Sequence, residues 1–115
     1  MQKKAVFFDI DGTIWDRENR IPDSTISAIR RLRKLGHLAF ICTGRTRGYI
    51  QNPSLLDIGF DGIVSGCGTM IEYQNQVIYY NELDKNLVEY TIETVRSHGF
   101  RPILEGSKYL YMDTE

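Results

Sequence analysis

The sequence predicts an α/β fold with a parallel sheet, and three observations support this expectation. Residues 4–8, 37–43 and 62–65 are short and almost continuously apolar, which is typical of strands buried on both faces of a sheet. Segments that suit helices separate these runs, so the order is strand, helix, strand, helix, strand. Strands joined in this way are parallel with right-handed crossovers, and 115 residues suffice for one domain with its own core.

The two connecting segments differ in how strongly they predict a helix. Residues 21–25 suit a helix N-terminus, because Pro22 stands among several residues that can cap the first turn. Apolar residues then recur at helical spacing as far as the stop signal Gly36, namely at Ile26, Ile29, Leu32 and Leu35. Residues 46–58 predict only a weak helical connection, which Pro53 kinks or interrupts.

A hairpin, a helix and two more strands are expected after the third strand. The hairpin segments alternate in hydrophobicity around Gln74 and Asn75. The helix is bounded by a cap at Asp84 and a stop at Gly99. The predicted strands of this part are residues 69–73, 76–80, 100–104 and 108–112.

Composition and charge exclude several classes of protein. A net charge of -1 gives no overall attraction to nucleic acid or anionic membranes. One basic cluster fits a solvated helix face better than a nucleic-acid patch; it consists of Arg30, Arg31, Arg33 and Lys34. Asp9 stops the first apolar run too early for a signal peptide or a spanning helix, so we expect a cytoplasmic protein without nucleic-acid or membrane partners. Cys42 and Cys67 match no CxxC spacing and are expected to be reduced and buried.

Two carboxylates follow the first predicted strand, in the segment AVFFDIDGTI. Asp9 and Asp11 are two residues apart, so in an extended chain they point the same way, and Gly12 lets the backbone turn beyond them. The second strand ends in the same manner at Thr43. Ligands of open parallel sheets collect beyond the carboxyl ends of the strands. We therefore expect Thr43 to lie beside Asp9, with the amides of Gly44 and Arg45 free to bind an anion.

These groups suit a divalent cation together with a phosphate. A carboxylate and a phosphate dianion repel each other, so a hard cation such as Mg²⁺ has to bridge them before attack. An EF-hand fails as an alternative, because Ile14 and Arg20 stand where such a loop needs Gly and Glu. An acidic turn that merely ends a strand is the remaining alternative, and the strand–Thr–Gly–Arg pattern some thirty residues later argues against it.

Three segments resemble one known family. FFDIDGT, ICTGR and SGCGTMIEY are similar to motifs of the haloacid dehalogenase-like (HAD) phosphatases, in their Cof-type, sugar-phosphatase-like branch. The resemblance implies a Rossmann-like HAD core with an incomplete parallel sheet over residues 1–80, including the hairpin. It also implies that residues 81–115 begin an inserted α/β cap domain.

The resemblance also implies a role for each matching residue. Asp9 would be the nucleophile that becomes an aspartyl-phosphate, and it would bind Mg²⁺. Asp11 would be the general acid and base, with its main-chain carbonyl on the metal. Thr43 and the Gly44 amide would hold the phosphoryl group of a small phosphorylated metabolite, such as a sugar phosphate. Arg45 would either contact the substrate at its phosphate or form an ion pair within its own loop. Trp15 and Asp16, which follow the motif, are expected to be a packing aromatic and a helix-side charge.

The chain departs from the family pattern beyond these motifs. None of its five lysines follows the second motif in a strand–helix context, and no GDxxND-like acidic motif is present. Two accounts remain open. The chain is either the N-terminal part of a longer Mg²⁺-dependent phosphatase, with little activity alone, or a small metal- or phosphate-binding protein. In the second account, two copies of the chain complete the site, or the protein is not catalytic.

Overall fold

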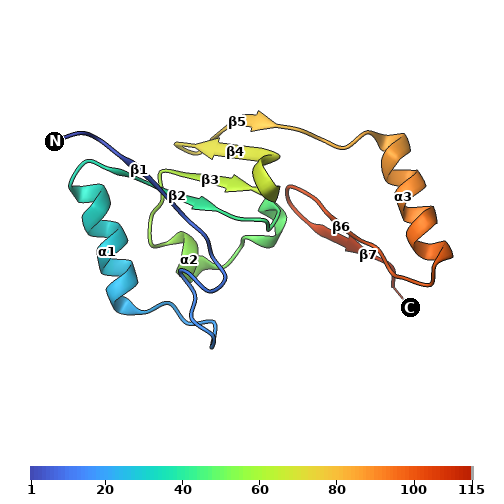
Figure 1. Ribbon diagram of the computed structural model, residues 1–115, viewed down its shortest axis with the longest axis horizontal. Coiled ribbons are helices and arrows are strands. Elements are labelled where there is room, and N and C mark those ends of the chain that lie inside the picture. The colour runs from blue at the N-terminus through green and yellow to red at the C-terminus, as the bar shows by residue number, and fades with distance from the viewer. Residues whose placement is uncertain (115) are drawn as a thin grey trace.

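The computed structural model describes residues 1–114 and confirms the α/β class (Figure 1). Its main sheet has five strands in sequence order: β1 (Ala5–Phe8), β2 (Leu38–Cys42), β3 (Gly62–Ser65), β4 (Met70–Tyr73) and β5 (Gln76–Tyr80). The first three are parallel, and the hairpin β4–β5 extends the sheet in antiparallel fashion. A separate antiparallel pair consists of β6 (Ile103–Glu105) and β7 (Leu110–Met112).

The helical elements are α1 (Asp23–Lys34), the 3-10 turn η1 (Arg47–Tyr49), α2 (Pro53–Leu56), the 3-10 turn η2 (Gly66–Gly68) and α3 (Lys85–Ser97). The two long helices lie where the sequence predicts them, and the weak connection over residues 46–58 holds only η1 and α2. Pro53 begins α2, because a first-turn proline needs no hydrogen-bond partner for its nitrogen. Asp84 caps α3 as predicted, since its Oδ1 accepts a hydrogen bond of 3.1 Å from the Leu87 amide.

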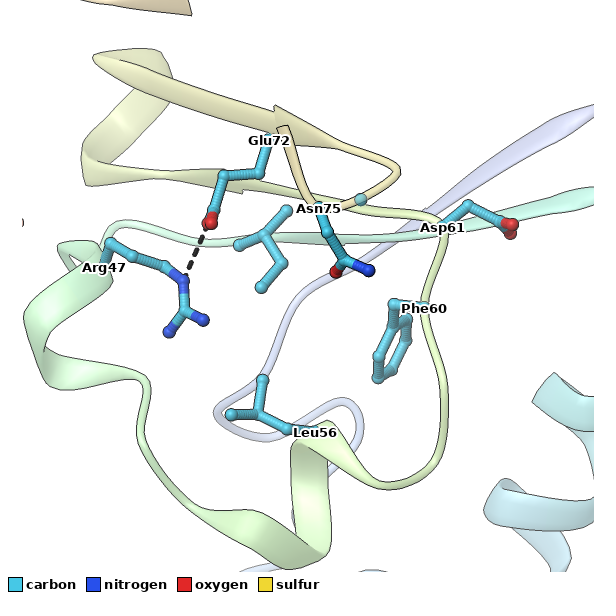
Figure 2. Close-up of a pocket in the computed structure, with 8 residues that line it drawn as sticks. Arg47, Leu56, Phe60, Asp61, Glu72 and Asn75 are labelled. Carbon is cyan, nitrogen blue, oxygen red and sulfur yellow. Dashed lines mark hydrogen bonds and ion pairs between the residues drawn. The ribbon is translucent and has the colours of Figure 1, made fainter. Parts of the chain in front are cut away.

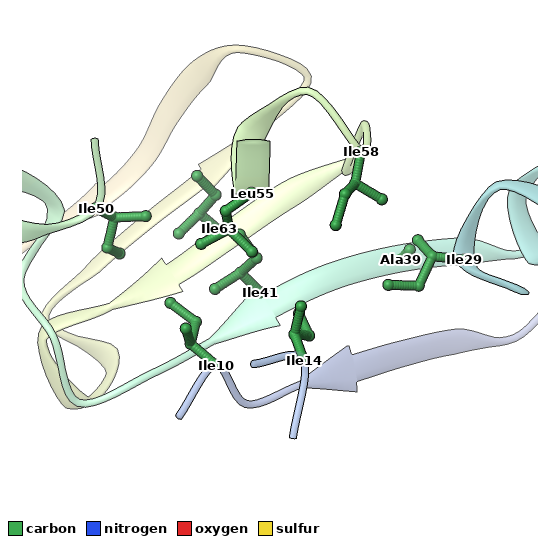
Figure 3. Close-up of a cluster of buried hydrophobic side chains, with 9 residues drawn as sticks. All are labelled: Ile10, Ile14, Ile29, Ala39, Ile41, Ile50, Leu55, Ile58 and Ile63. Carbon is green, nitrogen blue, oxygen red and sulfur yellow. The ribbon is translucent and has the colours of Figure 1, made fainter. Parts of the chain in front are cut away.

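A single cluster of buried aliphatic side chains forms the core on one side of the sheet (Figure 3). Strand β2 contributes Ala39 and Ile41 at alternate positions, β3 contributes Ile63, and α1 and the segment around α2 cover them (Figure 1). The cluster consists of Ile10, Ile14, Ile29, Ala39, Ile41, Ile50, Leu55, Ile58 and Ile63. Two of these, Ile10 and Ile14, belong to the loop after β1, so the core holds this loop directly.

The other side of the sheet carries a row of aromatic rings. Phe7, Phe40, Gly62 and Tyr73 lie opposite one another on four successive strands. Gly62 leaves space for the rings of Phe40 and Tyr73 to stack at 5.8 Å between centroids, and Phe40 stacks on Phe7 at 5.0 Å. Phe7 is 55% exposed, which corrects the expectation that β1 is buried on both faces. The reason is that β1 is an edge strand of the described sheet.

The amino-terminal ends of β2 and β3 are joined by Asp61. Its carboxylate accepts two hydrogen bonds of 3.0 Å from Arg33 and one of 2.8 Å from the Ala39 amide. Arg30 of the same basic cluster donates to the carbonyls of Ile58 and Asp57. Two of the four residues of the basic cluster, Arg30 and Arg33, therefore stabilise the segment before β3 by hydrogen bonds.

The segment after Tyr80 lies beyond the carboxyl ends of β2 and β3 (Figure 1). Strand β6 starts later than predicted, because the Phe100 amide closes the end of α3 by bonding the Val95 carbonyl, and Pro102 cannot donate to a ladder. The division of the chain at residue 80 into core and cap remains a prediction, and its last residue, Glu115, lies outside the described residues. Within residues 1–114, no helix has both the length and the apolar character to cross a membrane.

Candidate active site

The carboxyl ends of β1, β2 and β3 lie at one edge of the sheet, as the sequence predicts. Phe8 lies opposite Ile41, and Cys42 lies opposite Val64, so the loops that begin at Asp9, Thr43 and Gly66 are neighbours. This confirms that the strand ending at Asp9 adjoins the strand ending at Thr43.

The loop after β1 explains why the two acids are separated by one residue. Ile10 between them is fully buried, whereas Asp9 and Asp11 are exposed. The Ile10 carbonyl accepts hydrogen bonds from the amides of Thr13, Ile14 and Trp15, at 3.2, 3.0 and 3.0 Å. The buried Ile10 side chain thus fixes the loop, and both carboxylates remain on its solvent side.

Asp11 is paired with Arg45. The Nε atom of Arg45 lies 2.8 Å from Oδ2 of Asp11, and its Nη2 lies 2.6 Å from Oδ1. The hydrogen bond and charge of Arg45 hold the pKa of Asp11 below its ordinary value, although partial burial opposes this shift. Arg45 thus forms its ion pair with the predicted general acid in the loop after β1, and not within its own loop. Its contact with a phosphate stays a prediction.

Two aromatic rings flank the Arg45 guanidinium. Its central carbon lies 4.9 Å from the ring centroid of Trp15 and 4.4 Å from that of Tyr49. Trp15 also packs against the core cluster, as expected of a packing aromatic. Asp16 lies on no helix, since its carboxylate accepts hydrogen bonds from the Glu18 and Arg20 amides within a turn. Sequence reasoning missed the aromatic contact of Tyr49, for which the only signal was its position in the loop after Arg45.

The loop after β2 provides the predicted phosphate cradle only in part. Thr43 is 6% exposed, and its hydroxyl accepts a 3.0 Å hydrogen bond from the Arg45 amide. This amide is therefore not free, which corrects the expectation of two bare amides. The correction has a local cause, because no helix begins at Gly44 and the next turn, η1, starts at Arg47. The amide of Gly44 has no hydrogen-bond partner among the described residues.

The loop after β3 supports the cradle from the other side. The Gly66 amide donates to the Arg45 carbonyl at 2.7 Å, and the Cys67 amide donates to the Thr43 carbonyl at 3.2 Å. Gly66 and Cys67 both have left-handed backbone conformations, with φ of 57° and 56°. Sequence analysis did not assign this supporting role, although Gly66 and Gly68 directly after a strand were its signal.

Both cysteines are free thiols, but they are exposed, so the expectation of buried side chains is wrong. Cys42 is the last residue of β2, at the sheet edge where loops replace covering elements. Cys67 lies in the glycine-rich turn, where its sulfur would be 3.5 Å from a Cβ at Gly44. Their positions at strand ends explain the exposure.

The tip of the β6–β7 hairpin contacts the same region. The Gly48 amide donates to the Gly106 carbonyl at 3.2 Å, and the Gln51 side chain donates to the Lys108 carbonyl at 3.0 Å. A Cβ at Gly48 would come within 2.6 Å of the Gly106 oxygen, so only glycine permits this approach. The loop around Tyr49 is thereby hydrogen-bonded to the tip of the β6–β7 hairpin, more than fifty residues later in the sequence.

The donor set fits a hard cation in one respect. The Asp9 carboxylate is exposed and has no hydrogen bond or ion pair with another described residue, so its oxygens are available to a metal. The carboxylate of Asp11 is occupied by Arg45. Among residues 1–114, no three His, Cys, Asp or Glu side chains form a group that could hold a metal ion.

A cavity of about 260 Å³ lies away from these residues (Figure 2). Arg47 and Glu72 form an ion pair of 2.7 Å at one side of it, and Leu56 and Phe60 supply apolar walls. None of the predicted site residues lines this cavity.

Comparison with known proteins gives this geometry a family context. The chain is 36% identical over 104 residues to "Putative phosphatase YkrA" of Bacillus subtilis (strain 168), covering 90% of this chain and 40% of that protein. A hypothetical protein from Geobacillus kaustophilus HTA426 superposes with a TM-score of 0.86 at 30% identity, over 96% of this chain and 43% of that one. The HAD subclass IIB sugar phosphatase BT4131 superposes with a TM-score of 0.81 at 30% identity, over 96% and 44% of the two chains.

The chain thus spans less than half the length of each of these proteins. A family model described as haloacid dehalogenase-like hydrolase matches residues 6–115, which is nearly the whole chain. The resemblance of the three sequence motifs is therefore confirmed, and the chain belongs to the haloacid dehalogenase-like hydrolase family.

Proposed function

We propose that the chain carries the nucleophile, the general acid and part of the phosphate cradle of a Mg²⁺-dependent phosphomonoester hydrolase. The observation that carries the proposal is the state of Asp9, an exposed carboxylate without a described partner, at a sheet edge next to Thr43. A nucleophile needs this freedom, because its oxygen has to reach the phosphorus atom in line with the leaving group.

The reaction has two steps. An oxygen of Asp9 attacks phosphorus, the ester P–O bond breaks, and the leaving oxygen takes a proton from Asp11. Water then attacks the phosphorus of the aspartyl-phosphate and gives its proton to Asp11, which releases inorganic phosphate and restores Asp9. The Thr43 hydroxyl and the Gly44 amide are proposed to bind the phosphoryl oxygens throughout.

Asp9, with the main-chain carbonyl of Asp11, would hold the Mg²⁺ ion. The cation supplies charge that offsets the repulsion between the carboxylate and the phosphate dianion. A small phosphorylated metabolite, such as a sugar phosphate, is the proposed substrate class, in keeping with the sugar phosphatase among the similar structures.

The isolated chain is expected to hydrolyse phosphomonoesters only slowly. Electrostatic stabilisation is usually the largest catalytic contribution, and loss of one donor commonly reduces the rate by about 10²–10³-fold. The resemblance implies a lysine beside the phosphate, and none of the five lysines in the given sequence lies in the predicted phosphate cradle.

The test compares p-nitrophenyl phosphate turnover by this chain and its Asp9→Ala variant, with Mg²⁺. Slow turnover that disappears in the variant supports the proposal. Turnover that survives the substitution excludes Asp9 as the nucleophile. Robust turnover that depends on Asp9 means instead that a second copy of the chain supplies the missing groups, which sedimentation measurements on the active sample would detect.

A further inference from the structure

In this structure Arg45 binds the carboxylate of Asp11, which has to be free to act as the general acid of the proposed reaction. Both carboxylate oxygens of Asp11 accept a hydrogen bond from its guanidinium, at 2.8 and 2.6 Å. The leaving-group oxygen of a substrate would have to approach one of these same atoms. A carboxylate held on both oxygens by a planar fork is therefore in the wrong arrangement to serve that oxygen.

We propose that Arg45 exchanges its partner during substrate binding, from Asp11 to the phosphate group of the substrate. This inference rests on the proposed function and adds a positioning role for Arg45. In the substrate-free site Arg45 holds Asp11, and an incoming phosphate takes the guanidinium and frees Asp11. Once Arg45 has left, Asp11 can take a proton from solvent and then donate it to the leaving-group oxygen.

The surroundings of Arg45 suit such an exchange. Trp15 and Tyr49 contact the guanidinium at 4.9 and 4.4 Å from their ring centroids, and neither has a described hydrogen bond with it. These cation–π contacts do not use the N–H donors of the guanidinium, which remain available to an anion. A phosphate accepts the same two-pronged hydrogen bonds as a carboxylate and carries more charge. The side chain can therefore change partners without leaving its aromatic contacts.

The main chain of Arg45 is fixed where the phosphate is expected. Its amide donates to the Thr43 hydroxyl at 3.0 Å, and its carbonyl accepts from the Gly66 amide at 2.7 Å. The predicted phosphate donors, Thr43 and Gly44, immediately precede it in the chain. The Asp11 side chain is 56% exposed, so water can replace Arg45 around its carboxylate at low cost.

Arg47 provides a matched comparison within the same loop. Its Nε donates to Glu72 at 2.7 Å, and its Nη1 donates to the Ile50 carbonyl. This arginine holds a strand and its own loop together, whereas the described hydrogen bonds of the Arg45 side chain go to Asp11 alone. Only Arg45 is therefore expected to respond to a phosphate ion.

The experiment titrates the chain with inorganic phosphate at constant ionic strength. Trp15 is the only tryptophan, so its fluorescence reports on the guanidinium stacked against it. The NMR signals of the Arg45 Nε–H group and of the Thr43 and Gly44 amides report on the exchange and on phosphate binding separately. The variants are Asp11→Asn, Arg45→Met and their combination, with Arg47→Met as the control.

Phosphate is expected to shift the Trp15 emission and the Arg45 signal of the wild type and of Arg47→Met. The Trp15 response should disappear in Arg45→Met. Asp11→Asn should bind phosphate roughly three- to tenfold more tightly, because Arg45 no longer has to leave a carboxylate. When Arg45 is already replaced by Met, Asp11→Asn should increase the phosphate affinity clearly less. This comparison separates the exchange from the mere removal of a negative charge that repels phosphate.

Three results overturn the exchange. If phosphate shifts the Thr43 and Gly44 amides while the Arg45 and Trp15 signals stay unchanged, the exchange is wrong and the proposed phosphate site stands. An equal gain from Asp11→Asn with and without Arg45 refutes it in the same way. If phosphate shifts none of these signals, both the exchange and the phosphate site of the proposed function are wrong.

Discussion

Asp61→Asn is expected to reduce the free energy of unfolding by about 2 kcal/mol at neutral pH. The Asp61 carboxylate accepts two hydrogen bonds from Arg33 and one from the Ala39 amide, all between 2.8 and 3.0 Å. Hydrogen bonds to a charged group contribute about 1.5–3 kcal/mol, but Arg33 is partly exposed and the ion pair is screened. Asparagine keeps one acceptor oxygen, so some of these hydrogen bonds remain. The expected decrease in the free energy of unfolding is therefore about 2 kcal/mol.

The cost of Asp61→Asn should depend on pH in a defined direction. Burial opposes ionisation of Asp61, but the hydrogen bonds from Arg33 and the Ala39 amide outweigh it and lower the pKa of this carboxyl. A carboxyl whose pKa is lower in the folded state stabilises the fold fully above its unfolded pKa. The stabilisation is lost as the pH falls through the folded pKa, so the difference between wild type and variant should shrink below about pH 4.

Urea unfolding followed by circular dichroism measures the free energy of unfolding of wild type and Asp61→Asn. Comparison of neutral pH with about pH 3 gives the pH dependence of their difference. Asp57→Asn is the matched control, because Asp57 is exposed and its side chain accepts no described hydrogen bond, so a change within about 0.5 kcal/mol is expected. The reasoning is refuted if Asp61→Asn costs no more than the control. It is also refuted if the cost is the same at both pH values.

Three further outcomes are expected. Gly62→Ala should cost about 1–3 kcal/mol or more in urea unfolding, since its Cβ would lie 2.3 Å from the Glu72 carbonyl oxygen; a neutral effect would contradict the packing. Cys42 and Cys67 should both react with a thiol reagent in the native chain, and reaction only after unfolding would refute their exposure. Gly48→Ala should speed amide exchange in β6–β7 without changing exchange in β2, because its Cβ would collide with the hairpin tip; unchanged exchange there would remove the contact.

The sequence predicts the sheet and its functional edge well, because both depend on local patterns. Apolar runs mark β1, β2 and β3, and Asp9 and Thr43 follow two of them directly. Because parallel strands joined by crossover connections have their carboxyl ends at the same edge, these residues come together without further information. The exposure of Phe7 could not be read in the same way, since an apolar run does not tell whether its strand is central or at an edge.

Side-chain partners were less predictable. Arg45 could have contacted a substrate or another residue, and only the folded chain brings it to Asp11, 34 positions earlier. The same holds for Cys67, whose exposure follows from the turn after β3 rather than from its small apolar neighbours. Such contacts depend on how loops from different strands face one another, which no local pattern encodes.

Two arginine–aspartate pairs at opposite ends of the same sheet show how similar geometry can support different roles. Arg33 binds Asp61 through two hydrogen bonds of 3.0 Å, and Arg45 binds Asp11 through two of 2.8 and 2.6 Å. Asp61 also accepts a main-chain amide from β2, and its side chain is only 16% exposed, whereas Asp11 is 56% exposed.

Breaking the Asp61 pair would leave a largely buried charge and an unpaired strand amide, so this pair fixes the fold. Breaking the Asp11 pair leaves a carboxylate that water can solvate and a guanidinium that still contacts two rings. The two pairs therefore differ in burial and in the additional backbone donor, and not in the residue types, and the proposed exchange at Asp11 depends on this difference. The Asp61 pair thus stabilises the amino-terminal end of the sheet, whereas the exposed Asp11 at the other end meets the condition for the proposed exchange.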